Sequence, residues 1–121
     1  MEKQARQPLA PAEIERRLGT PGLLGEIRGA LREAFGRRFR GLILYGSRAR
    51  GDEKSYSDVD MLVLLEGPVE WGSDLTTAIE ATRAARIRAG VLLSVRPVDV
   101  RIYEEQYWPL YRSAREEGIA L

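Results

Sequence analysis

The apolar residues of the chain recur with two different periods, and these periods predict its secondary structure. Over residues 22–37 they recur every three or four positions, which predicts an amphipathic helix with arginines on its outer side. Two shorter apolar runs, at 41–45 and 58–65, have the length of strands. The second becomes almost continuously apolar, as in a central strand covered on both faces. Helical spacing returns at 73–89, and a third strand region follows at 92–102.

Turn and helix-end signals complete the order of elements. Pro11 suits the first position of a short helix over 12–18, since it lacks only an N–H that would be unpaired there. Pro97 lies in the middle of the third strand region and predicts an edge strand, a bulge or a break. A last helix covers about 104–117, with Gly118 after it. The order α, α, β, β, α, β, α, with a compact turn between the first two strands, predicts a mixed β-sheet with helices packed against it, an α/β (α+β) fold.

Length and composition limit the possible domain organisation and the kinds of chemistry that the chain can perform. The 121 residues predict an N-terminal tail with one short helix, residues 1–21, and a single domain, residues 22–121. The absence of cysteine excludes disulfides, thiolate metal sites and a cysteine nucleophile. The absence of histidine excludes the commonest general base and transition-metal ligand. Any bound metal is therefore expected to be a hard cation held by oxygen, such as Mg²⁺ or Mn²⁺.

Charge and hydropathy limit the expected classes of binding partner and the expected cellular location. The formal net charge of +1 argues against a nucleic-acid partner. No apolar run approaches the roughly 20 residues of a membrane span, and the N-terminus lacks the apolar segment of a signal peptide. We therefore expect a soluble, cytoplasmic protein that does not bind membranes.

The first predicted strand is closed by a turn of small and basic residues, Gly46-Ser47-Arg48-Ala49-Arg50-Gly51. A glycine there lets a ligand approach the backbone without a Cβ in its way, and the N–H groups after it can point at an anion. The Ser47 hydroxyl adds a donor, and the guanidinium groups of Arg48 and Arg50 match phosphate oxygens. A Gly-Ser turn alone is more often an ordinary turn, so the phosphate interpretation depends on what lies beside it.

A pair of aspartates, Asp58 and Asp60, is the sharper signal, because it stands at the mouth of the second strand. Side chains at i and i+2 of a strand point to one face, and two carboxylates held there repel each other unless a cation lies between them. Ser57, just before them, could hydrogen-bond a carboxylate or the turn backbone. Asp99, in the third strand region, is the candidate for a third carboxylate if that strand neighbours the second. The other interpretation of Asp99 is a surface pair with Arg101.

These residues resemble the signature of the minimal nucleotidyltransferases of the DNA polymerase β superfamily: a Gly-Ser turn, a short gap, an Asp-x-Asp pair and a third acid on a later strand. The resemblance implies a nucleotidyltransferase fold like the polymerase β palm, and transfer of a nucleoside monophosphate with release of pyrophosphate. It implies that Asp58, Asp60 and Asp99 are catalytic and hold Mg²⁺ or Mn²⁺, with Asp99 on the second metal or acting as base. Nucleotide binding, with ATP as the expected substrate, is assigned to Gly46, Ser47, Arg48, Arg50 and Ser57.

The resemblance is closest to short bacterial members, which implies a partner chain, since 121 residues leave no room for a separate acceptor domain. In such pairs the partner is a small helical HEPN protein. The two form a toxin–antitoxin module in which the nucleotidyltransferase is the antitoxin and AMP transfer onto a toxin tyrosine is one mechanism. The apolar and aromatic C-terminal helix also favours partner docking or self-association into a homo-oligomer.

Three other functions are compatible with parts of the sequence. The principal alternative is a non-catalytic nucleotide-binding antitoxin that neutralises its partner by occlusion. Transfer to a small molecule such as an aminoglycoside is weaker, because no acceptor pocket is evident. Nucleotide addition to RNA is weak as well, because the charge is near neutral.

Overall fold

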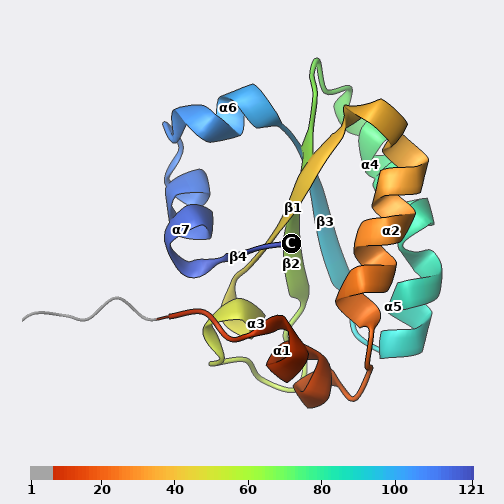
Figure 1. Ribbon diagram of the computed structural model, residues 1–121, viewed down its shortest axis with the longest axis vertical. Coiled ribbons are helices and arrows are strands. Elements are labelled where there is room, and N and C mark those ends of the chain that lie inside the picture. Colours follow the sequence, from red (N-terminus) through yellow and green to blue (C-terminus); the bar gives the residue numbers. More distant parts are fainter. Residues whose placement is uncertain (1–6) are drawn as a thin grey trace, which may run out of the picture.

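A computed structural model describes residues 7–121, and its centre is a sheet of four strands (Figure 1). In the order β3-β2-β1-β4, the strands span Leu93–Asp99, Val59–Leu65, Phe39–Tyr45 and Ile119–Ala120. β1 runs antiparallel to both of its neighbours, whereas β2 and β3 are parallel. The mixed sheet and the antiparallel β1–β2 pair confirm the prediction.

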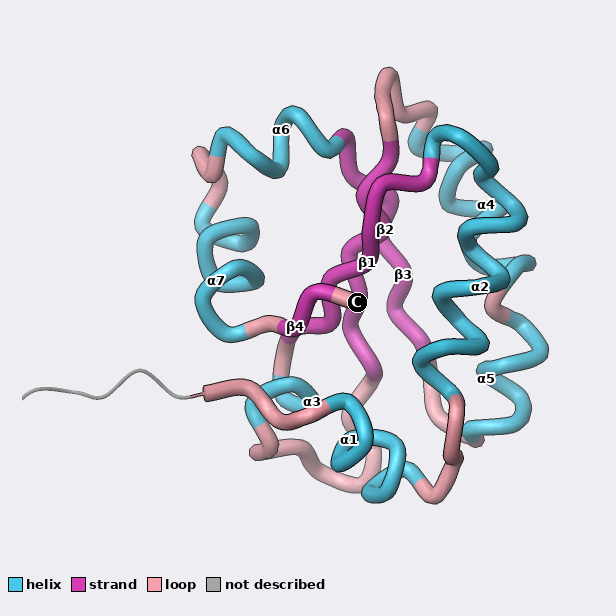
Figure 2. The backbone as a smooth tube through the Cα atoms, viewed as in Figure 1, coloured by secondary structure: helices cyan, strands magenta, loops and turns pink. Residues whose placement is uncertain are grey.

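Helices cover both faces of this sheet (Figure 2). One face carries α2 (Leu23–Phe35), α4 (Trp71–Ala81) and α5 (Arg83–Ala89), and the other carries α6 (Val100–Glu105) and α7 (Pro109–Glu117). The short helices α1 (Pro11–Leu18) and α3 (Ser47–Arg50) lie together near the end of the sheet where β1 stops (Figure 1), and the 3-10 turn η1 (Gly36–Arg38) leads from α2 into β1. Within residues 7–121, no helix has both the length and the apolar character needed to cross a bilayer.

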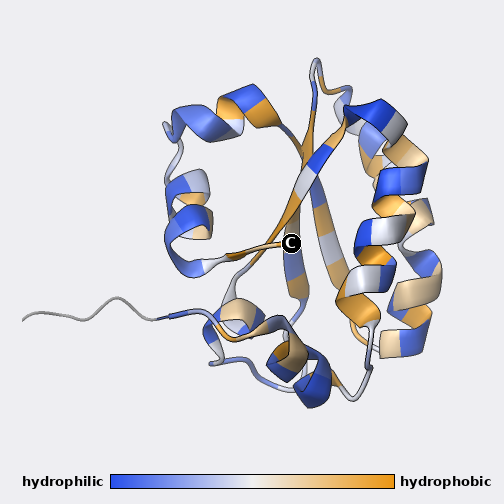
Figure 3. Cartoon of the chain, viewed as in Figure 1, coloured by the Kyte–Doolittle hydropathy of each residue, from blue (hydrophilic) through white to orange (hydrophobic). Residues whose placement is uncertain are grey.

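Alternate residues of β2 face two separate apolar layers, and Figure 3 shows the strand apolar along most of its length. One layer, under α2, contains Val59, Met61, Val63 and Leu65 of this strand. The other, under α6 and α7, contains Leu62 and Leu64. Burial on both faces explains the continuous apolar run that the sequence shows. Ile14 of α1 is fully buried in the first layer, so α1 packs against the same core as the rest of the domain.

The structure corrects the predicted elements at four points. The helix predicted over about 104–117 is two helices, since α6 ends at Glu105 and α7 begins at Pro109. The helix predicted at 73–89 is two helices, interrupted at the buried Thr82, whose hydroxyl donates to the Ala78 carbonyl at 2.8 Å. The third strand ends at Asp99 rather than at residue 102, because the chain turns there into α6. β4 was not predicted, since two residues carry no periodicity. Pro97 lies in β3, which is an edge strand, as its missing N–H led us to expect.

A bidentate ion pair fixes the start of α4 beside the entrance to β1. The Arg38 guanidinium donates to both carboxylate oxygens of Asp74, at 2.8 and 2.9 Å, and also to the carbonyls of Glu66 and Pro68. Asp74 accepts the N–H of Glu70 as well, at 3.0 Å. The hydrogen bonds from Arg38 hold the pKa of Asp74 below its ordinary value, although burial acts in the opposite direction.

We expect Asp74→Asn to lower the free energy of unfolding by about 1–3 kcal/mol at neutral pH, because it leaves the Arg38 guanidinium without its ionic partner. The stabilisation by the native pair is complete above the unfolded-state pKa of the carboxyl group. It is lost as the pH falls through the lowered pKa of the folded state. Urea unfolding of the wild type and of Asp74→Asn, at neutral pH and at about pH 3, measures both free energies of unfolding. The difference between the two proteins should be smaller at the lower pH. The same difference at both pH values would show that the charge of Asp74 does not contribute to stability.

Candidate active site

β1 ends in a glycine whose missing side chain lets a carboxylate touch the backbone. Gly46 adopts φ 80° and ψ −164°, a conformation essentially restricted to glycine. A Cβ placed on it would lie 2.5 Å from Oδ2 of Asp60. In the turn that follows, the N–H groups of Ala49 and Arg50 both donate to the Gly46 carbonyl at 3.1 Å. The N–H groups of Ser47 and Arg48 are the first of α3 and so lack a partner four residues earlier in the helix, which suits the binding of an anion.

Asp58 and Asp60 stand together at this same end of the sheet. Asp60 pairs with Tyr45 across the β1–β2 ladder, and Asp58 lies just before β2 begins. Burial raises the pKa of Asp60, the charge of Asp58 raises it further, and the Arg50 guanidinium offsets part of the rise. The charge of an ionised Asp60 is therefore compensated only in part by its surroundings. A cation bound between the two carboxylates would relieve their repulsion.

The donor set of this acid pair fits one hard divalent cation. Carboxylate oxygens are ligands that Mg²⁺ and Mn²⁺ prefer, and phosphate oxygens and water commonly fill the remaining positions. Among residues 7–121, no group of three or more acidic, histidine or cysteine side chains is placed to hold a metal. A second ion held by a third carboxylate has no support in the described part of the chain.

Asp99 does not join the acid pair, which corrects the prediction that it completes the metal site. β3 is parallel to β2, with Ser94 beside Asp60 and Asp99 beside Leu65. At about 3.3 Å per residue, this register puts Asp99 about 16 Å from the acid pair along the strand, at the opposite end of the sheet. The cause is the connection between the strands: α4 and α5 carry the chain back, so that β3 starts beside the start of β2.

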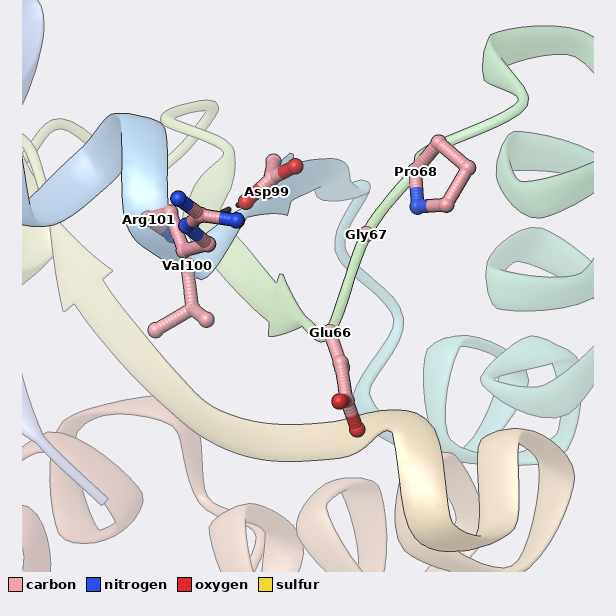
Figure 4. A pocket seen from close by; sticks show the side chains of 6 residues that line it. All are labelled: Glu66, Gly67, Pro68, Asp99, Val100 and Arg101. Atoms are coloured by element: carbon pink, nitrogen blue, oxygen red, sulfur yellow. Dashed lines mark hydrogen bonds between the residues drawn. The ribbon is translucent and has the colours of Figure 1, made fainter.

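Asp99 lies instead beside a hollow at that opposite end (Figure 4). The hollow measures about 350 Å³ and is lined by Glu66, Gly67, Pro68, Asp99, Val100 and Arg101. The Asp99 carboxylate packs so closely against Gly67 that a side chain there would collide with it. It accepts the Arg101 N–H at 2.8 Å and thereby caps α6. Asp99 therefore has a structural task, and its bond is to the backbone of Arg101 rather than to its side chain.

The Arg48 side chain points into the protein, which corrects the prediction that its guanidinium matches phosphate oxygens. Its side chain is only 6% exposed, and the guanidinium donates to the Ser57 carbonyl at 3.1 and 3.2 Å and to the Ser55 carbonyl at 3.4 Å. The Ser57 hydroxyl accepts the Lys54 N–H at 2.9 Å. Both side chains therefore shape the loop that delivers Asp58. The nucleotide contact of Ser57 stays a prediction, since its hydroxyl proton remains to be donated.

Arg50 is the basic side chain of the turn that acts on the acid pair. Its charge lowers the pKa of Asp60, as described above. It also forms ion pairs with Asp52 at 3.3 Å and with Glu117 at 3.2 Å, and its side chain is about one-third exposed. Ion pairs with this much solvent contact are weak, so a phosphate could replace one of the carboxylates. The phosphate contact assigned to Arg50 stays a prediction.

Three residues that the sequence analysis did not single out complete this end of the sheet. Tyr45, Asp60 and Ser94 form a row across β1, β2 and β3, and Arg96 stands two residues beyond Ser94 on the same face. Burial raises the pKa of Tyr45, the Asp60 charge raises it further, and the charge and hydrogen bonding of Arg96 act against the rise. Alternation along β3 places Ser94 and Arg96 on one face, but only the register with β2 shows that Asp60 is their neighbour.

We expect Gly46→Ala to lower the free energy of unfolding by about 1–3 kcal/mol, because alanine must adopt a strained backbone conformation and its Cβ must displace the Asp60 carboxylate. Mn²⁺ binding, followed by calorimetry, should weaken in the same variant. Gly29→Ala is the matched control, since Gly29 is an exposed position of α2 with open space around its Cα. That change should stabilise the protein by up to about 1 kcal/mol and leave Mn²⁺ binding unchanged. Equal effects of the two changes would refute the close contact.

We expect Asp60→Asn to raise the melting temperature of the metal-free protein by a few degrees at neutral pH. A carboxyl group whose pKa is raised by folding destabilises the protein when it is ionised, and this penalty disappears as the pH falls below its unfolded-state pKa. Added Mg²⁺ should raise the melting temperature of the wild type but not of Asp60→Asn. Asp99→Asn is the control and should keep the Mg²⁺ response. The same response in Asp60→Asn would remove Asp60 from the metal site.

Comparison with known proteins agrees with this geometry. A relative from Methanocaldococcus jannaschii, which bears the name "putative protein adenylyltransferase", is 28% identical over 97 residues, covering 79% of this chain and 91% of that protein. Residues 24–121 match the family model described as "Nucleotidyltransferase domain". That segment contains the whole sheet and both members of the acid pair. The mixed sheet with helices on both faces is consistent with the nucleotidyltransferase fold, and the chain belongs to the nucleotidyltransferase domain family.

Proposed function

We propose that this chain is a metal-dependent nucleotidyltransferase that moves AMP from ATP to a hydroxyl group of a partner protein. The observation that carries the proposal is the contact between Asp60 and Gly46, with Asp58 beside it, because it sets two carboxylates against a turn suited to a triphosphate. Membership of the family supports nucleotidyl transfer as the reaction. The name of the archaeal relative supports a protein as the acceptor.

Each residue of the site has a task in this reaction. Gly46 and Ser47 bind the β- and γ-phosphates through backbone N–H groups and the Ser47 hydroxyl. Asp58 and Asp60 hold Mg²⁺, which neutralises charge that develops on the triphosphate. The acceptor oxygen attacks the α-phosphorus, the bond from that atom to the bridging oxygen breaks, and pyrophosphate leaves with the electron pair. The acceptor proton passes to solvent, since Asp99 lies at the other end of the sheet.

The partner that we propose is a small helical protein of the HEPN type, with this chain as the antitoxin of the pair. The support is the likeness of the Gly46-Ser47 turn and the acid pair to short bacterial nucleotidyltransferases that act with such partners. A surface suited to contact lies just before α7, where Tyr107 is 71% exposed. Exposed aromatic side chains of this kind are enriched at protein interfaces.

A non-catalytic antitoxin that binds nucleotide and occludes its partner is the second candidate. One observation favours it: Ser94, not a carboxylate, stands beside Asp60 on β3, and residues 7–121 supply no third acid for a metal. Two carboxylates and a phosphate-binding turn would suffice to hold Mg²⁺ and ATP. In that case the nucleotide would be bound without being consumed.

Incubation with ATP, Mg²⁺ and the helical protein encoded beside this chain separates the two candidates. If the chain transfers AMP, ATP labelled on the α-phosphate should label the partner and ATP labelled on the γ-phosphate should not, because pyrophosphate leaves. Asp58→Ala and Asp60→Ala should each lower the rate of labelling by about 100-fold or more. Asp99→Asn should label at close to the wild-type rate, since asparagine caps a helix about as well as aspartate.

Persistent labelling in Asp58→Ala and Asp60→Ala would contradict the role of the acid pair. A tight complex with the partner and no label from any nucleotide would favour occlusion instead. Loss of labelling in Asp99→Asn, with the fold intact, would return that residue to the reaction.

A further inference from the structure

The proposed reaction, on which this inference rests, orders the parts of the nucleotide across the sheet. The turn at Gly46 and Ser47, which takes the β- and γ-phosphates, lies at the end of β1. The Asp60 carboxylate, which would hold the metal, lies next to it on β2. A triphosphate that follows this line places its nucleoside over the next strand, β3.

A hollow of about 250 Å³ lies on the face of the sheet that carries Asp60, and one side chain of β3 lines it. It is lined by Arg96, Trp108, Pro109, Leu110 and Tyr111. Arg96 stands on the Asp60 face because it is two residues from Ser94, the neighbour of Asp60. The other four lining residues come from the start of α7, which packs over that face. We call this space the Arg96 hollow.

Tyr45 connects the Arg96 hollow to the acid pair. It is the cross-strand partner of Asp60 on β1. It packs with Tyr111 in the apolar layer under α6 and α7, and the charge and hydrogen bonding of Arg96 act on its hydroxyl. Both Arg96 and Tyr111 line the hollow. A ligand at the acid pair and a ligand in the hollow would therefore share Tyr45 as a neighbour.

The side chains around the hollow offer flat surfaces and one cation. Trp108 is 54% exposed, and Arg96 lines the hollow together with it. A purine base stacks favourably on indole rings and on guanidinium planes. None of the five lining residues is acidic, so the hollow repels neither ribose nor phosphate. This combination suits an aromatic ring that carries an anionic tail.

We propose that the Arg96 hollow is the nucleoside subsite of the active site, in which the purine ring of ATP stacks on Trp108 and Arg96. The triphosphate then extends past Tyr45 to the acid pair and the Gly46 turn. The hollow determines the preference for a nucleotide over a bare polyphosphate.

The two tryptophans of the chain, Trp71 and Trp108, make the proposal measurable without any partner protein. In Trp71→Phe the only indole is Trp108, and its emission should change when ATP with Mg²⁺ is added. Inorganic tripolyphosphate with Mg²⁺ should bind without that change, because it carries no ring. Arg96→Ala and Trp108→Ala should each raise the Kd for ATP roughly 10-fold, about the loss of one base stack, and leave the Kd for tripolyphosphate within about twofold.

Ile87→Ala is the matched control, because Ile87 is an exposed apolar residue of α5, on the opposite face of the sheet. It should leave both Kd values unchanged. Equal weakening of ATP and tripolyphosphate in Arg96→Ala and Trp108→Ala would overturn the subsite, as would ATP binding that leaves Trp108 emission unaltered. The outcome is separable from that of the proposed reaction. Selective loss of ATP binding would support the subsite even if no AMP is transferred, and transfer with unchanged Kd values in both variants would refute the subsite alone.

Discussion

The contact between the Asp60 carboxylate and the backbone at Gly46 is the constraint on which the chemistry of this protein depends. Any side chain at position 46 would occupy the space that the carboxylate fills, and the backbone conformation there excludes other residues as well. The contact joins the end of β1 to the start of β2 and so brings the Gly46-Ser47 turn against the acid pair. The antiparallel pairing of Tyr45 with Asp60 also holds the end of β1 beside Asp60. The strand pairing and the glycine contact therefore fix the same position of the turn relative to the acid pair.

The direction of β3 decides which residues accompany the acid pair. A strand that returned antiparallel would bring its last residues to Asp60, whereas the crossover through α4 and α5 brings its first ones. The neighbours of the pair are therefore Ser94 and Arg96, a hydroxyl and a cation, in place of a third carboxylate. This changes the electrostatics of the site. In the proposed reaction, metal binding would depend on two carboxylates, and the β3 side of the site would take the nucleoside end of the substrate rather than a second ion.

The sequence was sufficient to predict most of the elements and the acid pair, because both depend on local patterns. Period and turn signals located the strands at 41–45 and 58–65 within a few residues. The two-residue spacing of Asp58 and Asp60 required only that one strand begin there. Asp99 was misplaced because its position depends on the register between two strands separated by a helical crossover, and no local pattern encodes that register. Arg96 was missed for the same reason.

Arg48 and Arg50 show where residue type ceases to be informative. They are two residues apart on one short turn and carry the same charge, yet Arg48 is buried against the carbonyls of the 55–57 loop while Arg50 stays partly exposed beside the acid pair. The loop before β2 needs a buried donor to satisfy its carbonyls, and the acid pair needs a nearby cation. Burial of Asp60 without full compensation then leaves the site with charge to neutralise. An apolar or amide side chain at position 60 would avoid this penalty in the metal-free protein, whereas a carboxylate there suits the binding of a cation.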